Sequence, residues 1–224
     1  MASNRSALID AVRSSALCAT LIASAAGTAI AQPPPTPPAN PSQRAVLPTI
    51  DPAKELKGQA LVDALRGGGY VLLMRHAKQD GVQETLPCTH RNLSIEGETD
   101  ARKIGAALRE LRIPIRAVRA STVCRAIETA AALGVGDVES TPDLDPGTSW
   151  TPQIHAARAR QLATRPAGAA NSLLVSHIHP SSNDDERVQY DHCEIIVYQP
   201  GEQGASTPVA RIPRHSWDAL ILLR

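Results

Sequence analysis

The sequence predicts an α/β protein: a three-layer sandwich with a mostly parallel central sheet and helices on both faces. Short apolar runs, such as residues 70–74 and 172–176, are typical of strands that are buried on both faces. Segments with a helical apolar period lie between these runs, and strands that alternate with helices form parallel sheets. The 224 residues suffice for one domain, whose core must be built from Ala, Leu, Val and Ile because Phe is absent.

Residues 1–31 have the pattern of a cleaved secretory signal. A basic segment precedes an uncharged run that closes on Ala29-Ile30-Ala31, an A-x-A cleavage site. The alternative is a transmembrane anchor, which the short run and its Ala, Ser, Thr and Gly content disfavour. Residues 32–50 are rich in proline and predict an extended, disordered linker. We therefore expect a folded domain over residues 51–224, in a periplasmic or secreted protein without stable membrane insertion once the signal is removed.

Capping residues and apolar spacing define the elements of this domain. Asp51 is expected to cap the first helix, with Pro52 at its first position. Ser94 is expected to cap a second helix, whose first turn carries Glu96 and Glu98. In order, the predicted elements are a helix at 51–65, a strand at 70–74, a loop at 78–92, a helix at 94–111, a strand at 117–120, a helix at 122–133, a strand near 135–138, a helix at 152–164, a strand at 172–176, and strands at 193–198 and 208–212 joined as a hairpin around 201–204.

Histidines and arginines gather at the predicted carboxyl ends of the strands. Arg75 and His76 directly follow one apolar run, and His177 follows another. Arg125 lies in the first turn of an Ala-rich helix, where free backbone N–H groups also favour an anion. Ligands of such sheets gather at the carboxyl ends of the strands. These residues predict a phosphate site in which guanidiniums hold the oxygens and a neutral imidazole attacks phosphorus.

In their order and spacing these segments resemble the histidine phosphatase superfamily, whose members are similar to phosphoglycerate mutases. The resemblance covers roughly residues 70–224, and the tail around Trp217 is similar to that of an exported bacterial branch. The matching segments are Leu73-Met74-Arg75-His76-Ala77, Asn92-Leu93-Ser94 with Gly97, Cys124-Arg125-Ala126 with Glu128-Thr129-Ala130, and Leu174-Val175-Ser176-His177.

The resemblance implies an enzyme that hydrolyses phosphomonoesters through a phosphohistidine intermediate, with neither a cofactor nor a metal. His76 is the implied nucleophile. Arg75 and Arg125 are the implied ligands of the equatorial oxygens, and His177 completes the pocket. Arginines suit this role because they stay charged and present forked donors.

The general acid that should protonate the leaving oxygen is less clearly marked. Asp145 is the first candidate because many relatives carry an acidic residue near this position, and Glu194 and Asp143 are its rivals. If none of them serves, the alternative function is a non-catalytic phosphate- or phosphosugar-binding protein of the same fold.

Export also bears on the three cysteines that follow residue 31. One disulfide and one free thiol are expected in an oxidising compartment. The preferred pair is Cys88 with Cys124, an arrangement that the exported branch shares, and Cys193 remains free. The alternative is three buried, unbridged thiols.

The expected partner is a small-molecule or glycan phosphomonoester. Loss of residues 1–31 reduces the basic residues from 23 to 21 and the acidic residues from 22 to 21, so the mature chain is formally neutral and has no nucleic-acid footprint. A metal site at His177 and His179 is an alternative, which the lack of a suitably spaced carboxylate disfavours. We interpret the remaining histidines as surface or core residues; these are His90, His155, His192 and His215. We interpret two basic residues, Lys78 and Arg91, as parts of a solvated loop.

Overall fold

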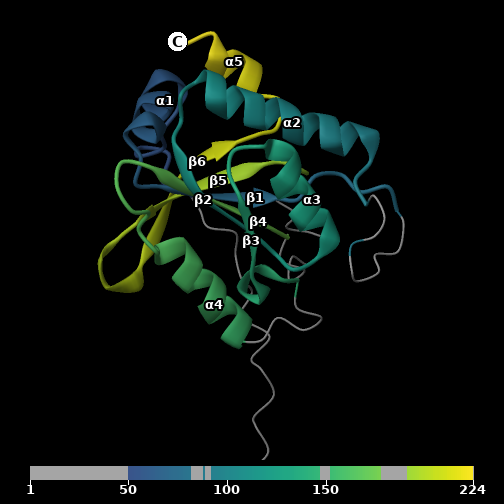
Figure 1. The fold of residues 1–224 in the computed structure, drawn as a ribbon. Helices are drawn as coiled ribbons and strands as arrows, with labels where there is room; N and C mark the ends of the chain where they lie inside the picture. Colours follow the sequence, from purple (N-terminus) through teal and green to yellow (C-terminus); the bar gives the residue numbers. More distant parts are fainter. Residues whose placement is uncertain (1–49, 82–87, 89–91, 147–151, 178–190, 224) are drawn as a thin grey trace, which may run out of the picture. The chain divides into compact units, whose positions relative to one another are not determined.

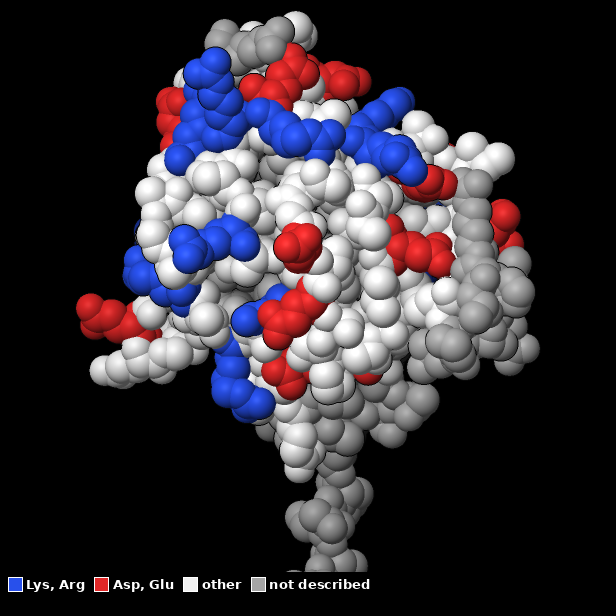
Figure 2. Space-filling view, in the orientation of Figure 1, with Lys and Arg blue, Asp and Glu red and all other residues white. Residues whose placement is uncertain are grey.

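The computed structural model describes residues 50–81, 88, 92–146, 152–177 and 191–223. The predicted signal segment, and the linker up to residue 49, lie outside the described residues. No helix within the described ranges is long and apolar enough to span a membrane. On the face seen in Figure 2, basic and acidic side chains are interspersed.

A six-stranded sheet in the order β3-β2-β4-β1-β5-β6 forms the centre of the fold (Figure 1). The pairs β1·β4, β2·β4 and β2·β3 are parallel, whereas β5 is antiparallel to both β1 and β6. The predicted mostly parallel sheet is thereby confirmed. The strands are β1 (Val71–Arg75), β2 (Ile115–Ala120), β3 (Val138–Ser140), β4 (Asn171–Ser176), β5 (Ile195–Pro200) and β6 (Ser206–Ile212).

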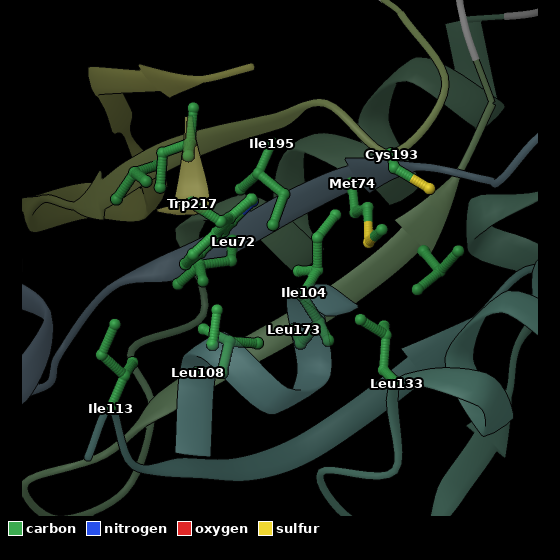
Figure 3. Packing of buried hydrophobic residues seen from close by; sticks show 14 of the residues in the cluster. Leu72, Met74, Ile104, Leu108, Ile113, Leu133, Leu173, Cys193, Ile195 and Trp217 are labelled. Carbon is green, nitrogen blue, oxygen red and sulfur yellow. The ribbon is translucent and has the colours of Figure 1, made fainter. Parts of the chain in front are cut away.

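Helices cover both faces of this sheet. In β1, Leu72 packs into a cluster with residues of α1, α2, α3 and α5, among them Ile104 and Leu133 (Figure 3). The neighbouring Val71 packs on the other face with Leu162 of α4. The three predicted layers are therefore present. The helices are α1 (Gly58–Gly67), α2 (Ile95–Glu110), α3 (Cys124–Leu133), α4 (Pro152–Ala163) and α5 (Trp217–Ile221), with short 3-10 turns η1 (Pro142–Leu144) and η2 (Glu202–Gly204).

The first predicted helix begins later than expected. Asp51 caps an isolated turn, in which its Oδ1 accepts the N–H of Ala53 at 3.0 Å. The N–H of Leu56 then donates to Val209 O of β6 at 2.8 Å, which holds this segment beside the sheet and delays α1 to Gly58. Strand β3 likewise begins at Val138, where its predicted strand ended, and α5 was not predicted.

Helices α2 and α3 pack closely together, and this contact positions one side of the site. Ser94 caps α2 as predicted, because its Oγ accepts the Gly97 N–H at 3.0 Å. Further along α2, a Cβ on Gly105 would overlap the Leu133 carbonyl at the end of α3, so only glycine allows this approach. The carboxyl end of α3 is thus held directly against α2.

Candidate active site

His76 lies directly after the carboxyl end of β1, an inner strand of the sheet. Its backbone N–H donates to Ser176 O at 2.9 Å, and its Nδ1 donates to Ala77 O at 2.9 Å. The N–H of Ala77 in turn donates to Thr129 Oγ1 of α3 at 2.9 Å. Because Nδ1 carries the proton, the lone pair lies on Nε2. The backbone thus selects the tautomer that a nucleophilic imidazole needs.

Arg125 connects His76 with the second predicted histidine. Its Nε donates to His76 Nε2 at 3.2 Å, and its Nη2 lies 3.1 Å from His177 Nδ1. Since a guanidinium only donates, both ring nitrogens must be acceptors. The two imidazole rings are 5.0 Å apart between centroids. The pairing of Arg75 with Ser176 across β1 and β4 explains this closeness, because His76 and His177 are the next residues of the two strands.

A hydrogen-bonded chain extends from His177 to Asp145. The Nε2 of His177 donates to Ser121 Oγ at 2.9 Å, and Ser121 Oγ donates to Asp145 Oδ1 at 2.7 Å. Asp145 also accepts the Thr122 N–H at 2.6 Å and the Thr122 hydroxyl at 2.6 Å. Both oxygens of Asp145 are therefore occupied, and this carboxylate orients the turn that follows β2.

Burial keeps both site histidines uncharged. Desolvation, opposed by the Ala77 carbonyl and reinforced by Arg125 and Arg75, lowers the pKa of His76 to about 3. Desolvation and the same cations lower the pKa of His177 to about 2. Burial also lowers the pKa of Arg75. Positive charge in the pocket is therefore carried by guanidiniums, while the imidazoles are neutral at physiological pH.

The three carboxylates considered for the general acid are all engaged in other contacts. Asp145 is held as described above. Glu194 is almost fully buried and forms a two-point ion pair with Arg211, and its Oε2 also accepts the Asp191 N–H at 3.0 Å. Asp143 Oδ2 accepts a hydrogen bond from Gln161 of α4 at 2.8 Å.

Three residues near the site were not predicted to act there. His192 was interpreted as an isolated histidine, but its ring lies 5.4 Å from that of His76. Arg158 of α4 donates to Ser176 Oγ at 2.6 Å and approaches His177 O at 3.5 Å. Ser121 connects His177 with Asp145. The chain carries no local signal for Arg158 or His192, whereas Ser121 follows a predicted strand, as His76 does.

The predicted Cys88–Cys124 disulfide is present, with 5.4 Å between the Cα atoms. Cys193 is a free, buried thiol. The disulfide attaches the segment that follows β1 to the first residue of α3, directly before Arg125. Within the described ranges, no three His, Cys, Asp or Glu side chains come together as metal ligands. The alternative site at His177 and His179 involves a residue outside the described part of the chain, and both ring nitrogens of His177 already have protein partners.

Comparison with known proteins agrees with this geometry. A sequence model of the histidine phosphatase superfamily (branch 1) matches residues 71–148, a range that includes Arg75, His76, Arg125 and Asp145. The predicted resemblance is thereby confirmed, and the match supports the predicted activity of a phosphoric monoester hydrolase. A search of curated proteins gives no significant match.

Solved structures with a similar chain course include two phosphatases. The protein histidine phosphatase SixA complexed with tungstate is 20% identical, with a TM-score of 0.49, and the match covers 65% of this chain and 97% of that one. Phosphoserine phosphatase from Entamoeba histolytica, in complex with 3-phosphoglyceric acid, is 14% identical with a TM-score of 0.44, and the match covers 64% and 96% of the two chains.

Proposed function

We propose that this chain, which resembles the histidine phosphatase superfamily, is a phosphomonoester hydrolase that works through a phosphohistidine on His76. The observation that carries this proposal is the state of His76: Nδ1 is tied to a carbonyl, Nε2 bears the lone pair, and the ring is neutral. An imidazole in this state can attack phosphorus without first losing a proton.

Substrate binding changes the partners of Arg125. Without substrate, its guanidinium donates to His76 Nε2 and His177 Nδ1. A phosphoryl group beside Nε2 offers charged oxygens, which are stronger acceptors than imidazole nitrogens. The guanidiniums of Arg125 and Arg75 then bind the equatorial oxygens, and Nε2 of His76 is released to attack in line with the leaving oxygen.

Two displacements complete the reaction. In the first, Nε2 forms a bond to phosphorus as the bond to the ester oxygen breaks, and the alcohol leaves with one proton. In the second, a water oxygen attacks phosphorus, the N–P bond breaks, and inorganic phosphate is released. Fixed guanidinium donors stabilise the charge on the equatorial oxygens in both transition states.

Within this mechanism Asp145 is a positioning residue rather than the general acid. Its oxygens accept hydrogen bonds from Ser121 and Thr122. Through Ser121 it fixes the proton of His177 on Nε2, which leaves Nδ1 as the acceptor facing Arg125. Asp145 therefore acts on the orientation of Arg125 and does not reach the leaving group itself.

We also propose that the enzyme is periplasmic or secreted and acts on a small or glycan-linked phosphomonoester. The basic and apolar amino-terminal pattern supports export, and a disulfide beside the site suits an oxidising compartment. Only about fifty residues separate Arg125 from His177, which favours an open site and therefore a broad or bulky substrate.

The test is replacement of the nucleophile. Wild-type protein that is incubated with a radiolabelled phosphate ester should acquire an acid-labile label and release phosphate, and His76→Ala should do neither while keeping its fold. His215→Gln, at an exposed histidine, is the matched control and should behave as wild type. Substantial turnover by His76→Ala would exclude the mechanism. Tight phosphate binding by a wild-type protein without turnover would favour the alternative of a binding protein.

A further inference from the structure

The reaction proposed above needs a group that supplies a proton to the leaving oxygen. The three carboxylates at the edge of the site are held by other partners: Asp145 by two hydroxyls and an amide, Glu194 by Arg211, and Asp143 by Gln161. Both oxygens of Asp145 and of Glu194, and Oδ2 of Asp143, are thus engaged with protein partners. A titratable residue beside His76 without such partners is a better candidate for the proton donor.

His192 is a half-buried imidazole beside His76. Its ring centroid lies 5.4 Å from that of His76, at an interplanar angle of 60°, nearly the same separation as between His76 and His177. Unlike His177, it is not part of the chain that leads to Asp145. A group at this distance is close enough to contact an ester oxygen of a phosphoryl group that rests against His76.

Backbone hydrogen bonds hold the turn that carries His192 against the end of β1. The N–H of Cys193 donates to Arg75 O at 3.1 Å, and the N–H of Arg75 donates to Glu194 O at 3.0 Å. The Glu194 carboxylate accepts the Asp191 N–H, and Arg211 of β6 holds that carboxylate in place. Cys193 has a φ of 62°, a strained conformation for a residue with a side chain. The backbone on both sides of His192 is thus fixed relative to Arg75 and His76.

We propose that His192 is the proton-transfer residue of this site, an assignment that rests on the proposed phosphatase function. In the first displacement the imidazolium of His192 gives its proton to the ester oxygen as the P–O bond breaks, and the product alcohol leaves neutral. In the second, the neutral imidazole takes a proton from the attacking water as the N–P bond breaks. His192 is thereby returned to its imidazolium form, and ester plus water becomes alcohol plus phosphate.

The charges around His192 suit this cycle. In the empty site, desolvation together with Arg75, Arg214 and Lys78 lowers its pKa to about 4, and Asp191 opposes them. A phosphate dianion placed beside Arg75 and His76 offsets these cations and raises the pKa of a neighbouring imidazole. His192 therefore takes up its proton together with the substrate, when the proton is needed.

The experiment compares two esters that differ in their need for a proton. 4-Nitrophenolate is a stable anion that leaves without help, whereas phenolate is more basic and gains more from protonation. His192→Gln should lower kcat/KM for phenyl phosphate by about 10² to 10⁴-fold, the usual contribution of general acid–base catalysis. The loss with 4-nitrophenyl phosphate should be much smaller, and acid-labile label on His76 should still form from it.

Four controls make the result decisive. His192→Asn is a second replacement, and calorimetric binding of inorganic phosphate reports an intact pocket in both variants. His215→Gln should match wild type with both esters. Asp191→Asn tests the neighbouring exposed carboxylate. Equal losses with both esters in folded His192 variants, or no loss at all, would overturn the assignment, as would the ester-selective loss appearing in Asp191→Asn instead. If wild type hydrolyses neither ester, the proposed function itself fails.

Discussion

The neutral state of the two buried imidazoles has a measurable consequence for stability at acid pH. His76 is 7% exposed and His177 is 8% exposed, and burial together with nearby cations lowers their pKa values to about 3 and about 2. Both side chains take up a proton with a pKa near 6.5 when the chain unfolds. Below pH 6.5 the unfolded state therefore binds protons that the folded state does not bind. The free energy of unfolding is highest above pH 6.5 and decreases as the pH falls below it.

The size of this loss at pH 5 follows from the unfolded pKa alone, because both folded values lie well below 5. Each imidazole that stays neutral in the folded state lowers the free energy of unfolding by about 1.4 kcal/mol for every pH unit below 6.5. At pH 5 the free energy of unfolding should therefore be lower than at pH 7.5 by about 2 kcal/mol for each imidazole, or about 4 kcal/mol for the pair. pH 5 is suitable because ordinary carboxylates remain largely ionised there.

Urea unfolding at pH 7.5, 6.5 and 5.0, with the disulfide intact, measures this difference. The variants His76→Gln and His177→Gln should each reduce the change in unfolding free energy between pH 7.5 and pH 5.0 by about 2 kcal/mol. His215→Gln, at an exposed histidine, should leave that change as in wild type. If His76→Gln and wild type respond equally to pH, His76 has the same pKa in the folded and unfolded protein, and the argument that burial keeps this imidazole neutral at acid pH fails.

Two further predictions concern the supports of the site. Ser121→Ala removes the acceptor of the buried His177 Nε2–H, so the free energy of unfolding should fall by about 1–3 kcal/mol and phosphatase turnover should decrease. Unchanged values in urea unfolding and in the hydrolysis assay would contradict the proposal that Ser121 orients His177. Reduction of the Cys88–Cys124 disulfide, which closes a loop with a sequence separation of 36, should cost about 3–4 kcal/mol and slow turnover. The same reducing agent should have no effect on Cys88→Ala, and equal effects on both proteins would show that the disulfide is not the cause.

The sequence predicts the parts of the site that lie at the ends of its strands. An apolar run marks a buried strand, and the polar residue that follows it marks the edge of the sheet, so His76 and His177 could be placed together before their contact was seen. The register of β1 with β4 makes them neighbours. The cap at Ser94 and the apolar positions of α2 could also be predicted, because capping and helical spacing are local properties of the sequence.

The parts that were missed depend on contacts between distant segments. Asp145 was predicted to be the acid from its position in the chain, and its contacts with Ser121 and Thr122, on which the proposed positioning role rests, form only in the folded protein. His192 stands alone in the sequence. It reaches His76 because β5 runs antiparallel to β1, which places the residues that precede β5 at the carboxyl end of β1. The position of His192 beside His76 could have been predicted only from the direction of β5.

The distribution of charge around the pocket connects these observations. Asp145 is bound by hydroxyls and an amide, and Glu194 forms an ion pair with Arg211. Burial removes the charge from His76, whereas a guanidinium stays charged even where burial lowers its pKa. The arginines therefore keep a permanent positive charge beside an uncharged nitrogen. A phosphohistidine mechanism requires this division, because the charge must hold the phosphate while the nitrogen remains free to attack it.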